Sequence, residues 1–259
     1  MPKLGIAIVG TGMIGAVHRR AALLAGADIR GVAASSPQRA LEVAQSWNVP
    51  RAYRDIEEVV ADPQVQVVHV CTPNHLHHPM AQAALQAGKH VICEKPLATT
   101  LEDAKALAGL AAATGLIATV PFVYRYHPVV REARARIAQG ELGPLHLIHG
   151  SYLQDWLLDP ASNNWRVDPT LGGMSRVFAD IGSHWCDLVE WVSGQRFTEV
   201  SAAFDTVIAE RSTDTGQSFT TAAAGGAMQA VTSEDVAAAM FRTGAGTLAS
   251  LTVSQVSAG

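Results

Sequence analysis

The sequence is poor in cysteine, in charge and in long apolar runs. Its three cysteines form no CxxC pair, and Cys71 and Cys93 end apolar runs, where a free thiol packs as a small hydrophobe. Only 16% of the residues are charged and the net charge is −4, which is too mild for a nucleic-acid binder. No run reaches the roughly 20 apolar residues that span a membrane. We therefore expect a reducing, cytoplasmic setting and neither nucleic-acid nor membrane partners.

The first half of the chain alternates between short apolar runs and helical patterns. With 48% apolar residues among 259, a sizeable core is available. Fully apolar strands that alternate with helices indicate a parallel sheet covered on both faces. We predict a doubly wound, Rossmann-type α/β domain over residues 1–120. Its expected strands lie at residues 4–10, 28–35, 65–73, 90–96 and 116–122, and its helices at residues 15–26, 37–47, 77–88 and 101–115.

The second half has a different texture. A helix is expected at residues 127–140 and another begins near Gly182, and from Phe197 onward the pattern alternates as in strands. This predicts an α+β domain over residues 121–259 with a mostly antiparallel sheet. The small-residue tract Thr220–Ala227 indicates a flexible loop.

The stretch "IVGTGMIG" places Gly10, Gly12 and Gly15 in G-x-G-x-x-G spacing between the first strand and the first helix. This is the placement that a dinucleotide-binding loop needs, because the glycines allow a tight turn, close approach to a pyrophosphate and close helix packing. The helix N-terminus would then face the anion. The alternative is a glycine-rich turn that binds nothing.

The stretch "CTPNHLHHP" follows an apolar strand, so Thr72, Pro73 and Asn74 should lie at the carboxyl edge of the sheet, where doubly wound folds bind ligands. Its histidines His75, His77 and His78 suggest a metal site. No carboxylate or thiolate nearby completes a ligand shell, and we expect solvated or cofactor-edge histidines and no metal.

The stretch "HVICEKP" ends an apolar strand with Glu94, Lys95 and Pro96. An exposed Glu–Lys pair would be the ordinary interpretation. The three stretches, followed by "YRYHP" and "DIGSHWCDL", resemble in order and spacing the Gfo/Idh/MocA oxidoreductases, a family of sugar and polyol dehydrogenases. The resemblance covers essentially all of the chain. It implies that Lys95 lies beside a nicotinamide and contacts a substrate hydroxyl.

In "FADIGSHWCDL", Asp180 and His184 are four residues apart. If the helix begins near Gly182, the carboxylate sits just ahead of its first turn and faces the imidazole, an arrangement suited to moving protons near neutral pH. The resemblance implies this use, with His184 as the acid/base and Asp180 orienting it. The alternative is an N-cap aspartate beside a packed histidine.

Aromatic and guanidinium groups that suit a polyhydroxylated ring follow the last strand of the first domain and recur in the polar stretch after it. Core, hinge or loop packing is the alternative use for them. The expected substrate-binding residues are Tyr124, Arg125, Tyr126, Trp165 and Arg166, with Trp156 beside them.

The position after the second strand bears on cofactor choice. An NAD-selective fold usually carries an Asp or Glu there, about 20 residues beyond the glycines, whereas this chain has Ala34. Ser35, Ser36 and Arg39 could instead contact a 2′-phosphate, unless Arg39 is a solvated helix residue. We predict a preference for NADP, with NAD tolerated. The full set of expected cofactor contacts is Gly10, Gly12, Met13, Ile14, Gly15, Ser35, Ser36, Arg39, Cys71, Thr72, Pro73, Asn74, His77, Glu94 and Lys95.

The predicted function is NAD(P)-dependent hydride transfer to or from a secondary alcohol or ketone of a sugar, polyol or related cyclic compound. Two alternatives stay open: an NAD-dependent glycoside hydrolase of the same fold and a cofactor-binding sensor without catalysis. The chain ends in a strand-like pattern, "LTVSQVSAG", whereas members of the family continue further. We therefore expect either a second domain that is incomplete here or a partner subunit, in a homodimer or homotetramer formed through this sheet.

Overall fold

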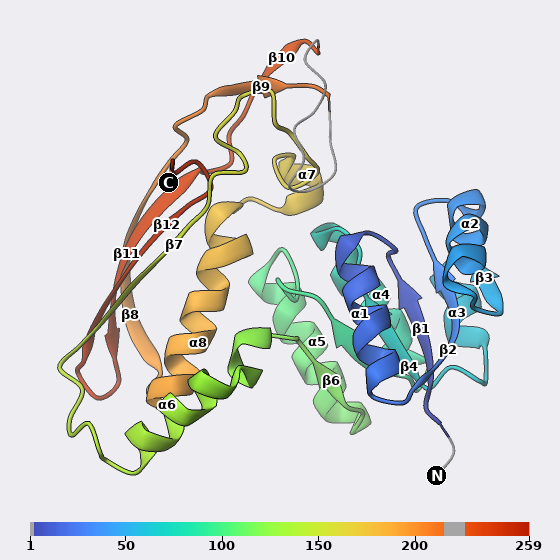
Figure 1. Ribbon diagram of the computed structural model, residues 1–259, viewed down its shortest axis with the longest axis horizontal. Helices are drawn as coiled ribbons and strands as arrows, with labels where there is room; N and C mark the ends of the chain where they lie inside the picture. Colours follow the sequence, from blue (N-terminus) through green and yellow to red (C-terminus); the bar gives the residue numbers. More distant parts are fainter. Residues whose placement is uncertain (1–2, 215–225, 259) are drawn as a thin grey trace. The chain divides into compact units, whose positions relative to one another are not determined.

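A computed structural model describes residues 3–214 and 226–258 of the chain, which forms two compact units, Met1–Pro121 (unit 1) and Phe122–Gly259 (unit 2). Within the described residues no helix has the length and hydropathy needed to cross a membrane. Most of the predicted loop Thr220–Ala227 lies outside these residues. Figure 1 shows the elements of both units.

Unit 1 is a six-stranded parallel sheet with helices between its strands, as the alternation of patterns predicted. The strand order is β3-β2-β1-β4-β5-β6. The elements in chain order are β1 (Gly5–Val9), α1 (Met13–Leu24), β2 (Asp28–Ala33), α2 (Pro37–Trp47), β3 (Arg51–Tyr53), α3 (Ile56–Ala61), β4 (Val67–Val70), η1 (Asn74–Leu76), α4 (His77–Gln86), β5 (His90–Cys93), α5 (Leu101–Thr114) and β6 (Ala118–Thr119).

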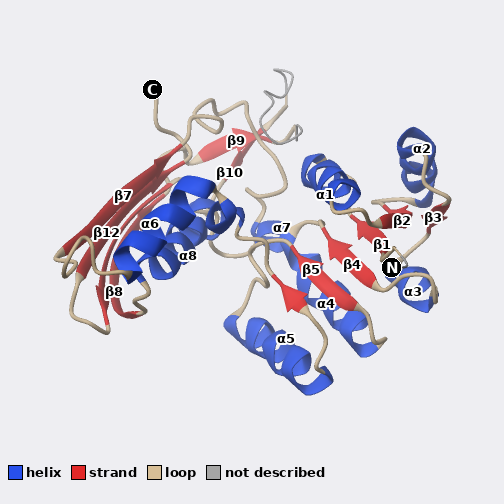
Figure 2. Cartoon of the chain, turned by 60° about the horizontal axis from the view of Figure 1, so that its bottom comes forward, coloured by secondary structure: helices blue, strands red, loops and turns tan. Residues whose placement is uncertain are grey.

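Both faces of this sheet are covered, as Figure 2 shows with α1 and α2 on one side and α4 and α5 on the other. Alternate residues of each strand enter the two cores. Ile6 and Ile8 pack with α1 and α2, whereas Ala7 and Val9 belong to the core shared with α3, α4 and α5. All five residues of β1 are buried, which explains why the strand shows no polar alternation.

Two details of unit 1 differ from the prediction. The short strand β3 and helix α3 were not foreseen, because three residues beginning with an exposed Arg51 carry little strand pattern. The strand expected at residues 116–122 is reduced to two exposed residues at the edge of the sheet, Ala118 and Thr119. A strand of two residues has too little pattern of its own, so its position is determined by its pairing with β5.

Unit 2 contains a four-stranded sheet in the order β7-β12-β11-β8. Helix α8 covers one face, where Trp185 stacks on Phe197 and Phe241, and Figure 2 shows α6 beside α8. The elements in chain order are η2 (Val123–Tyr126), α6 (Pro128–Ala138), β7 (Leu147–Leu153), α7 (Pro169–Gly172), η3 (Phe178–Gly182), α8 (Ser183–Ser193), β8 (Phe197–Asp205), β9 (Glu210–Ser212), β10 (Met228–Ala230), β11 (Val236–Thr243) and β12 (Leu248–Ser254).

The sheet of unit 2 is mostly antiparallel, as predicted, but β7 joins β12 in parallel. These two strands are about a hundred residues apart in the sequence, and parallel pairing requires a crossover connection rather than a tight turn. The local pattern of β7 cannot show which strand it will meet. The mixed sheet is therefore a product of the topology.

The helical turn before α8 begins earlier than predicted. Backbone geometry is already π-helical from Phe178 to Gly182, so Asp180 lies within a helical turn and not ahead of it. The cause is Glu234, whose carboxylate accepts hydrogen bonds from the backbone N–H groups of Arg176 and Phe178 at 2.9 and 3.1 Å. A carboxylate from a distant segment thus caps this helix, which the local sequence does not reveal.

Candidate active site

The glycine loop after β1 leaves no room for side chains at two of its three glycines. Gly10 has φ +95°, and a Cβ there would lie 2.4 Å from the Cys71 carbonyl oxygen; a Cβ on Gly15 would lie 2.1 Å from the Gly10 carbonyl oxygen. A Cβ on Gly12 would have no neighbouring atom within 4 Å, so this part of the backbone is open to an incoming group. Gly12 also precedes α1 without a side-chain cap, which leaves the helix N-terminus to an anion.

The loops after β1 and β4 leave the sheet where its strand order reverses. β1 lies between β2 and β4, so chain connections depart in opposite directions from this point, and doubly wound folds bind ligands there. After β4, Cys71 is buried, Pro73 precedes the short helix η1, and Asn74 is buried at its start. Thr72 and Asn74 therefore stand at the same edge as the glycine loop, as predicted.

The end of β2 carries no acidic side chain. Ala34 follows the strand, Ser35 is exposed, and the Ser36 hydroxyl oxygen caps α2 by accepting from the Arg39 backbone N–H at 3.1 Å. The Arg39 guanidinium lies 3.1 Å from a carboxylate oxygen of Glu42, one turn further on, and both side chains are about half exposed. Of the predicted phosphate contacts, Ser36 and Arg39 thus have partners within α2.

His77 is almost fully buried and connects two loops. Its Nδ1 lies 2.6 Å from the Pro96 carbonyl oxygen and its Nε2 lies 2.9 Å from the Thr72 carbonyl oxygen. Both neighbours only accept hydrogen bonds, so both contacts are satisfied together only when the ring carries two protons. Burial lowers the pKa of His77, while the two carbonyls and Glu94 act to raise it. In unit 1 this ring braces the Thr72 loop against the segment after Lys95.

Glu94 is buried beneath Lys95 and contacts a histidine pair. Its Oε1 lies 3.0 Å from His18 Nε2, and its Oε2 accepts from the Lys95 backbone N–H at 3.2 Å. His18 Nδ1 in turn lies 3.1 Å from His69 Nδ1. Burial acts to raise the pKa of Glu94, but the hydrogen bond and charge of His18, with Lys95, outweigh it and the pKa is lowered. Lys95 itself follows β5, the neighbour of the edge strand β6, by two residues.

In unit 2, His184 lies at the start of α8 among aromatic rings. Its ring centroid is 5.0 Å from that of Tyr124 and 5.7 Å from that of Phe122, both edge-on. The Tyr124 hydroxyl is 2.8 Å from the Tyr152 hydroxyl. Burial, this hydrogen bond and the charge of Asp180 raise the pKa of Tyr152, so its hydroxyl keeps its proton at neutral pH.

Asp180 is held from two directions. Its Oδ1 lies 3.4 Å from Arg166 Nε, and its Oδ2 accepts from Gln255 Nε2 at 2.8 Å. The Arg166 guanidinium is centred 4.4 Å from the Trp165 ring and 6.0 Å from the Trp156 ring. Such stacking fixes a planar cation in one orientation. The predicted Trp165 and Arg166 therefore come together with Asp180.

The remaining predicted residues of unit 2 are Arg125 and Tyr126. Arg125 forms a bidentate pair with Asp187, with Nε 2.7 Å from Oδ2 and a second contact through Nη2. Its guanidinium thus has a partner within the protein, which the sequence did not suggest. Tyr126 is 68% exposed and ends η2.

Unit 1 has the features that a bound dinucleotide needs. The open backbone at Gly12, the uncapped N-terminus of α1 and the switch point of the sheet are the features that a pyrophosphate requires. Among the residues described by the structure, no three His, Cys, Asp or Glu side chains gather as metal ligands.

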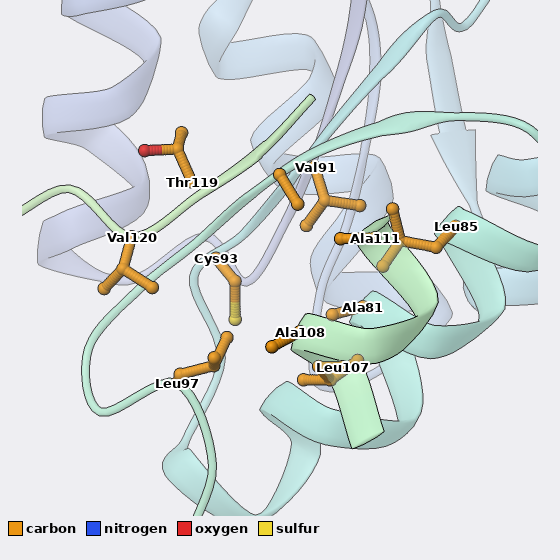
Figure 3. A pocket seen from close by; sticks show the side chains of 11 residues that line it. Ala81, Leu85, Val91, Cys93, Leu97, Leu107, Ala108, Ala111, Thr119 and Val120 are labelled. Carbon is orange, nitrogen blue, oxygen red and sulfur yellow. The ribbon is translucent and has the colours of Figure 1, made fainter. Parts of the chain in front are cut away.

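An apolar cavity of about 160 Å³ lies elsewhere in unit 1, between β5 and α5. Figure 3 shows the Cys93 thiol among its aliphatic side chains, which include Leu97 and Leu107. Burial, with the charge of Glu94, raises the pKa of Cys93, so the thiol is unreactive. The cavity lacks the convergent polar groups of a catalytic site.

The sequence reading missed four side chains of these groups: His18, His69, Tyr152 and Gln255. His69 interrupts an otherwise all-valine strand, "VVHV", and a polar residue within such a run was a usable signal. His18, Tyr152 and Gln255 gave none, because their partners are 28 to 76 residues away along the chain.

Comparisons with known proteins agree with this architecture. A family described as "Oxidoreductase family, NAD-binding Rossmann fold" matches residues 4–122, and the GFO/IDH/MocA C-terminal domain matches residues 130–259. Levoglucosan dehydrogenase of Pseudarthrobacter phenanthrenivorans is 35% identical over 226 residues, 83% of this chain and 57% of that protein. The chain thus spans little more than half the length of this relative.

Solved structures are similar over the whole chain. An oxidoreductase domain protein from Kribbella flavida has a TM-score of 0.91 at 32% identity, and all of this chain aligns with 70% of that one. Levoglucosan dehydrogenase in complex with NADH and levoglucosan has a TM-score of 0.89 at 31% identity and is covered to 68%.

Proposed function

The chain belongs to the Gfo/Idh/MocA family of NAD-binding oxidoreductases, and from this premise we propose that it is a nicotinamide-dependent dehydrogenase or reductase of carbohydrates. The reaction is hydride transfer between the cofactor and a secondary alcohol or ketone of a sugar, polyol or anhydro sugar. The observation that carries the proposal is the glycine loop at the switch point, where Gly10 and Gly15 exclude side chains and Gly12 opens the backbone.

Unit 1 would hold the dinucleotide. The backbone of Gly12, Met13 and Ile14 at the start of α1 suits the pyrophosphate, and the edge formed by Thr72, Pro73 and Asn74 suits the nicotinamide half. His77 contacts this edge through the Thr72 carbonyl oxygen. The bound nicotinamide supplies the hydride acceptor or donor, and the protein supplies position and charge.

We assign the chemical roles within each unit separately. We assign the alkoxide-stabilising charge to Lys95, whose backbone is fixed by Glu94 and whose following residue is braced by His77. We assign exchange of the hydroxyl proton to His184, and orientation of His184 to Asp180 in the preceding π-helical turn. Arg166 and Gln255 hold the Asp180 carboxylate in place. Trp165 and Tyr124 offer the aromatic faces that a sugar ring prefers.

The finer proposal is that NADP is preferred and NAD tolerated. Its support is the absence of an acidic residue at Ala34 and the exposed hydroxyl of Ser35. The Arg39–Glu42 pair is exposed, so it contributes at most about 1 kcal/mol and yields readily to a phosphate. The relative with a solved complex, by contrast, carries NADH.

The test is absorbance of the reduced cofactor at 340 nm during incubation with a panel of sugars, polyols and levoglucosan. We expect turnover with at least one of them. Lys95→Ala and His184→Ala should each lower kcat/KM by on the order of 100-fold or more, because both contacts strengthen in the transition state. Cofactor affinity, followed by quenching of tryptophan fluorescence, should change little. Variants with activity within a few-fold of the wild type would remove these residues from catalysis.

A further inference from the structure

The buried pair of His18 and His69 has no part in the chemistry described so far. His18 lies on α1, one turn after Gly15, and His69 lies on β4; they are 8% and 5% exposed. Their Nδ1 atoms face each other at 3.1 Å, and their rings meet edge to face with centroids 5.1 Å apart. Two buried imidazoles in the apolar core of a doubly wound sheet are costly unless their hydrogen bonds are made.

The hydrogen-bond chain has a definite direction. Glu94 is a carboxylate and only accepts, so His18 Nε2 carries a proton and donates to it. One proton lies between the two Nδ1 atoms, and it can be bonded to either ring. His69 Nε2 is buried and has no partner among the described residues. The chain therefore ends in the core at His69, and its other end is the Glu94 carboxylate.

We infer that His18 is a positioning residue that fixes the Glu94 carboxylate and, through it, the backbone of Lys95. The inference rests on the proposed function, in which Lys95 contacts the reacting hydroxyl. Glu94 Oε1 is occupied by His18 and Oε2 by the Lys95 N–H, while the Glu94 N–H donates to the Val70 carbonyl at 2.9 Å. The carboxylate is thus held on one side by α1 and on the other by the residue that it orients.

This arrangement also connects two functional segments of unit 1. Helix α1 starts at the glycine loop, and His18 is its sixth residue. A shift of α1 that accompanies binding of a pyrophosphate at its N-terminus would move His18 against Glu94. The contact would transmit cofactor binding to the Lys95 segment without any contact between Lys95 and the phosphates.

The charge of Glu94 depends on His18. Burial alone would raise the pKa of this carboxyl group, and the His18 donor is the first of the opposing influences. His69 stays neutral near pH 7, since burial and the neighbouring His18 lower its pKa to about 4. Loss of the His18 donor should therefore make Glu94 take up a proton at a higher pH. The titratable groups around the pair are His18, His69, Cys71, His77, Cys93, Glu94 and Lys95.

Two substitutions separate the halves of the imidazole. The amide nitrogen of Gln reaches the place of Nε2, so His18→Gln keeps a donor for Glu94 and loses the contact with His69. Asn reaches only the place of Nδ1, so His18→Asn keeps that contact and loses the donor. We expect His18→Gln to retain kcat within about 3-fold of the wild type and His18→Asn to lose about 10-fold or more, with similar melting temperatures.

A pH profile distinguishes positioning from a merely structural effect. In His18→Asn the acid limb of kcat should move to higher pH, because the unsupported Glu94 protonates earlier; in His18→Gln it should stay near that of the wild type. Equal kcat and equal profiles in the two variants would overturn the inference. Lys95→Ala, measured in the same assay, separates the two failures: unchanged kcat in Lys95→Ala would contradict the proposed function, whereas impaired Lys95→Ala beside equal His18 variants would contradict only the inference.

A measurement on the wild type covers the case in which neither variant folds. Long-range 1H–15N spectra, with His18 assigned through its backbone, reveal which ring nitrogens are protonated. We expect a proton on His18 Nε2 and a change of its shift when NAD or NADP is added. An unprotonated Nε2 would overturn the inference, and so would an unchanged His18 signal when the cofactor demonstrably binds. This readout needs no turnover.

Discussion

Units 1 and 2 both bury polar side chains, but they do so with different chemistry. The buried polar residues of unit 1 include three histidines and one carboxylate near β4 and β5, namely His18, His69, His77 and Glu94. Those of unit 2 include an ion cluster, in which the Asp235 carboxylate contacts the guanidinium groups of Arg176 and Arg211; all three side chains are fully buried.

The difference teaches what each unit requires of its interior. In unit 1 the imidazole and carboxyl groups can each take up or release a proton, and they contact the segment around Lys95. In unit 2 the two guanidinium groups share the Asp235 carboxylate, and the Glu234 carboxylate accepts from the Arg176 backbone N–H. These contacts tie the segment before α8 to β9 and to the residues just before β11. The first interior thus contains single titratable groups, whereas the second contains paired charges.

The largest effect is expected from the ion cluster. Asp235→Ala leaves Arg176 and Arg211 buried without their shared carboxylate, and removing one partner of a buried pair lowers the free energy of unfolding by about 3–5 kcal/mol. Four of the five tryptophans lie in unit 2, so urea denaturation followed by fluorescence reports on it. Glu199→Ala, which removes an exposed pair with Arg242, is the control and should cost under about 0.5 kcal/mol. If Asp235→Ala lost no more stability than the control, the buried Asp235 carboxylate would not be what stabilises unit 2.

The second effect concerns pH and unit 1. Burial lowers the pKa of His69 to about 4, against about 6.5 when unfolded. Between these values the unfolded chain binds the extra proton, so stability is complete above about pH 6.5 and declines as the pH falls toward 4. The decline due to this group is at most about 3 kcal/mol. Hydrogen exchange of β1 and β4 peptides measures it.

His69→Leu should remove most of this decline, since no buried imidazole is left at that position to take up a proton on unfolding. The exposed His149 on β7 provides the matched control, and His149→Leu should leave the exchange of β1 and β4 unchanged. If the slope of protection against pH persists in His69→Leu, unit 1 owes it to other groups.

A third prediction concerns the hydrogen bond that supports Asp180 in unit 2. Gln255 is fully buried and donates to Asp180 Oδ2. Gln255→Leu should lower kcat/KM by about 10-fold, the effect of one lost hydrogen bond to a charged group. Gln255→Glu places a second carboxylate beside Asp180, and like charges raise the pKa of one of them, so its effect should be larger. Equal activity of wild type and both variants would separate Asp180 from catalysis.

The smallest effect is expected at the edge of unit 1, where Arg39 is exposed. Arg39→Ala should lower the ratio of kcat/KM for NADP to that for NAD by about 3- to 10-fold, because a single charge-assisted contact in solvent is weak. Glu42→Gln frees Arg39 of its neighbour and should raise the same ratio slightly. A wild type that favours NAD, or a ratio that Arg39→Ala leaves unchanged, contradicts the proposed phosphate contact.

Local patterns were sufficient where a segment's role depends on its own backbone. The apolar strands β1, β4 and β5 and the glycine loop were predictable, because burial on both faces and the close approach at Gly10 and Gly15 leave few residue types possible. The positions of Thr72, Asn74 and Lys95 just beyond strand ends followed from the same patterns. The alternation of strands and helices predicted a parallel, doubly wound sheet, but the strand order that places β1 next to β4 came from the structure.

The sequence by itself therefore determined the class of fold, the glycine loop after β1 and the segments to which we assign the chemistry. Only the tertiary structure decided which side chains hold them in place: His18 on Glu94, Gln255 on Asp180 and Glu234 at the start of the π-helical turn. It also decided the parallel pairing of β7 with β12. The physical reason is the distance along the sequence between interacting residues. Helix and strand patterns arise from neighbours a few residues apart, whereas a hydrogen bond between residues 56 to 76 positions apart forms only after the whole chain has packed.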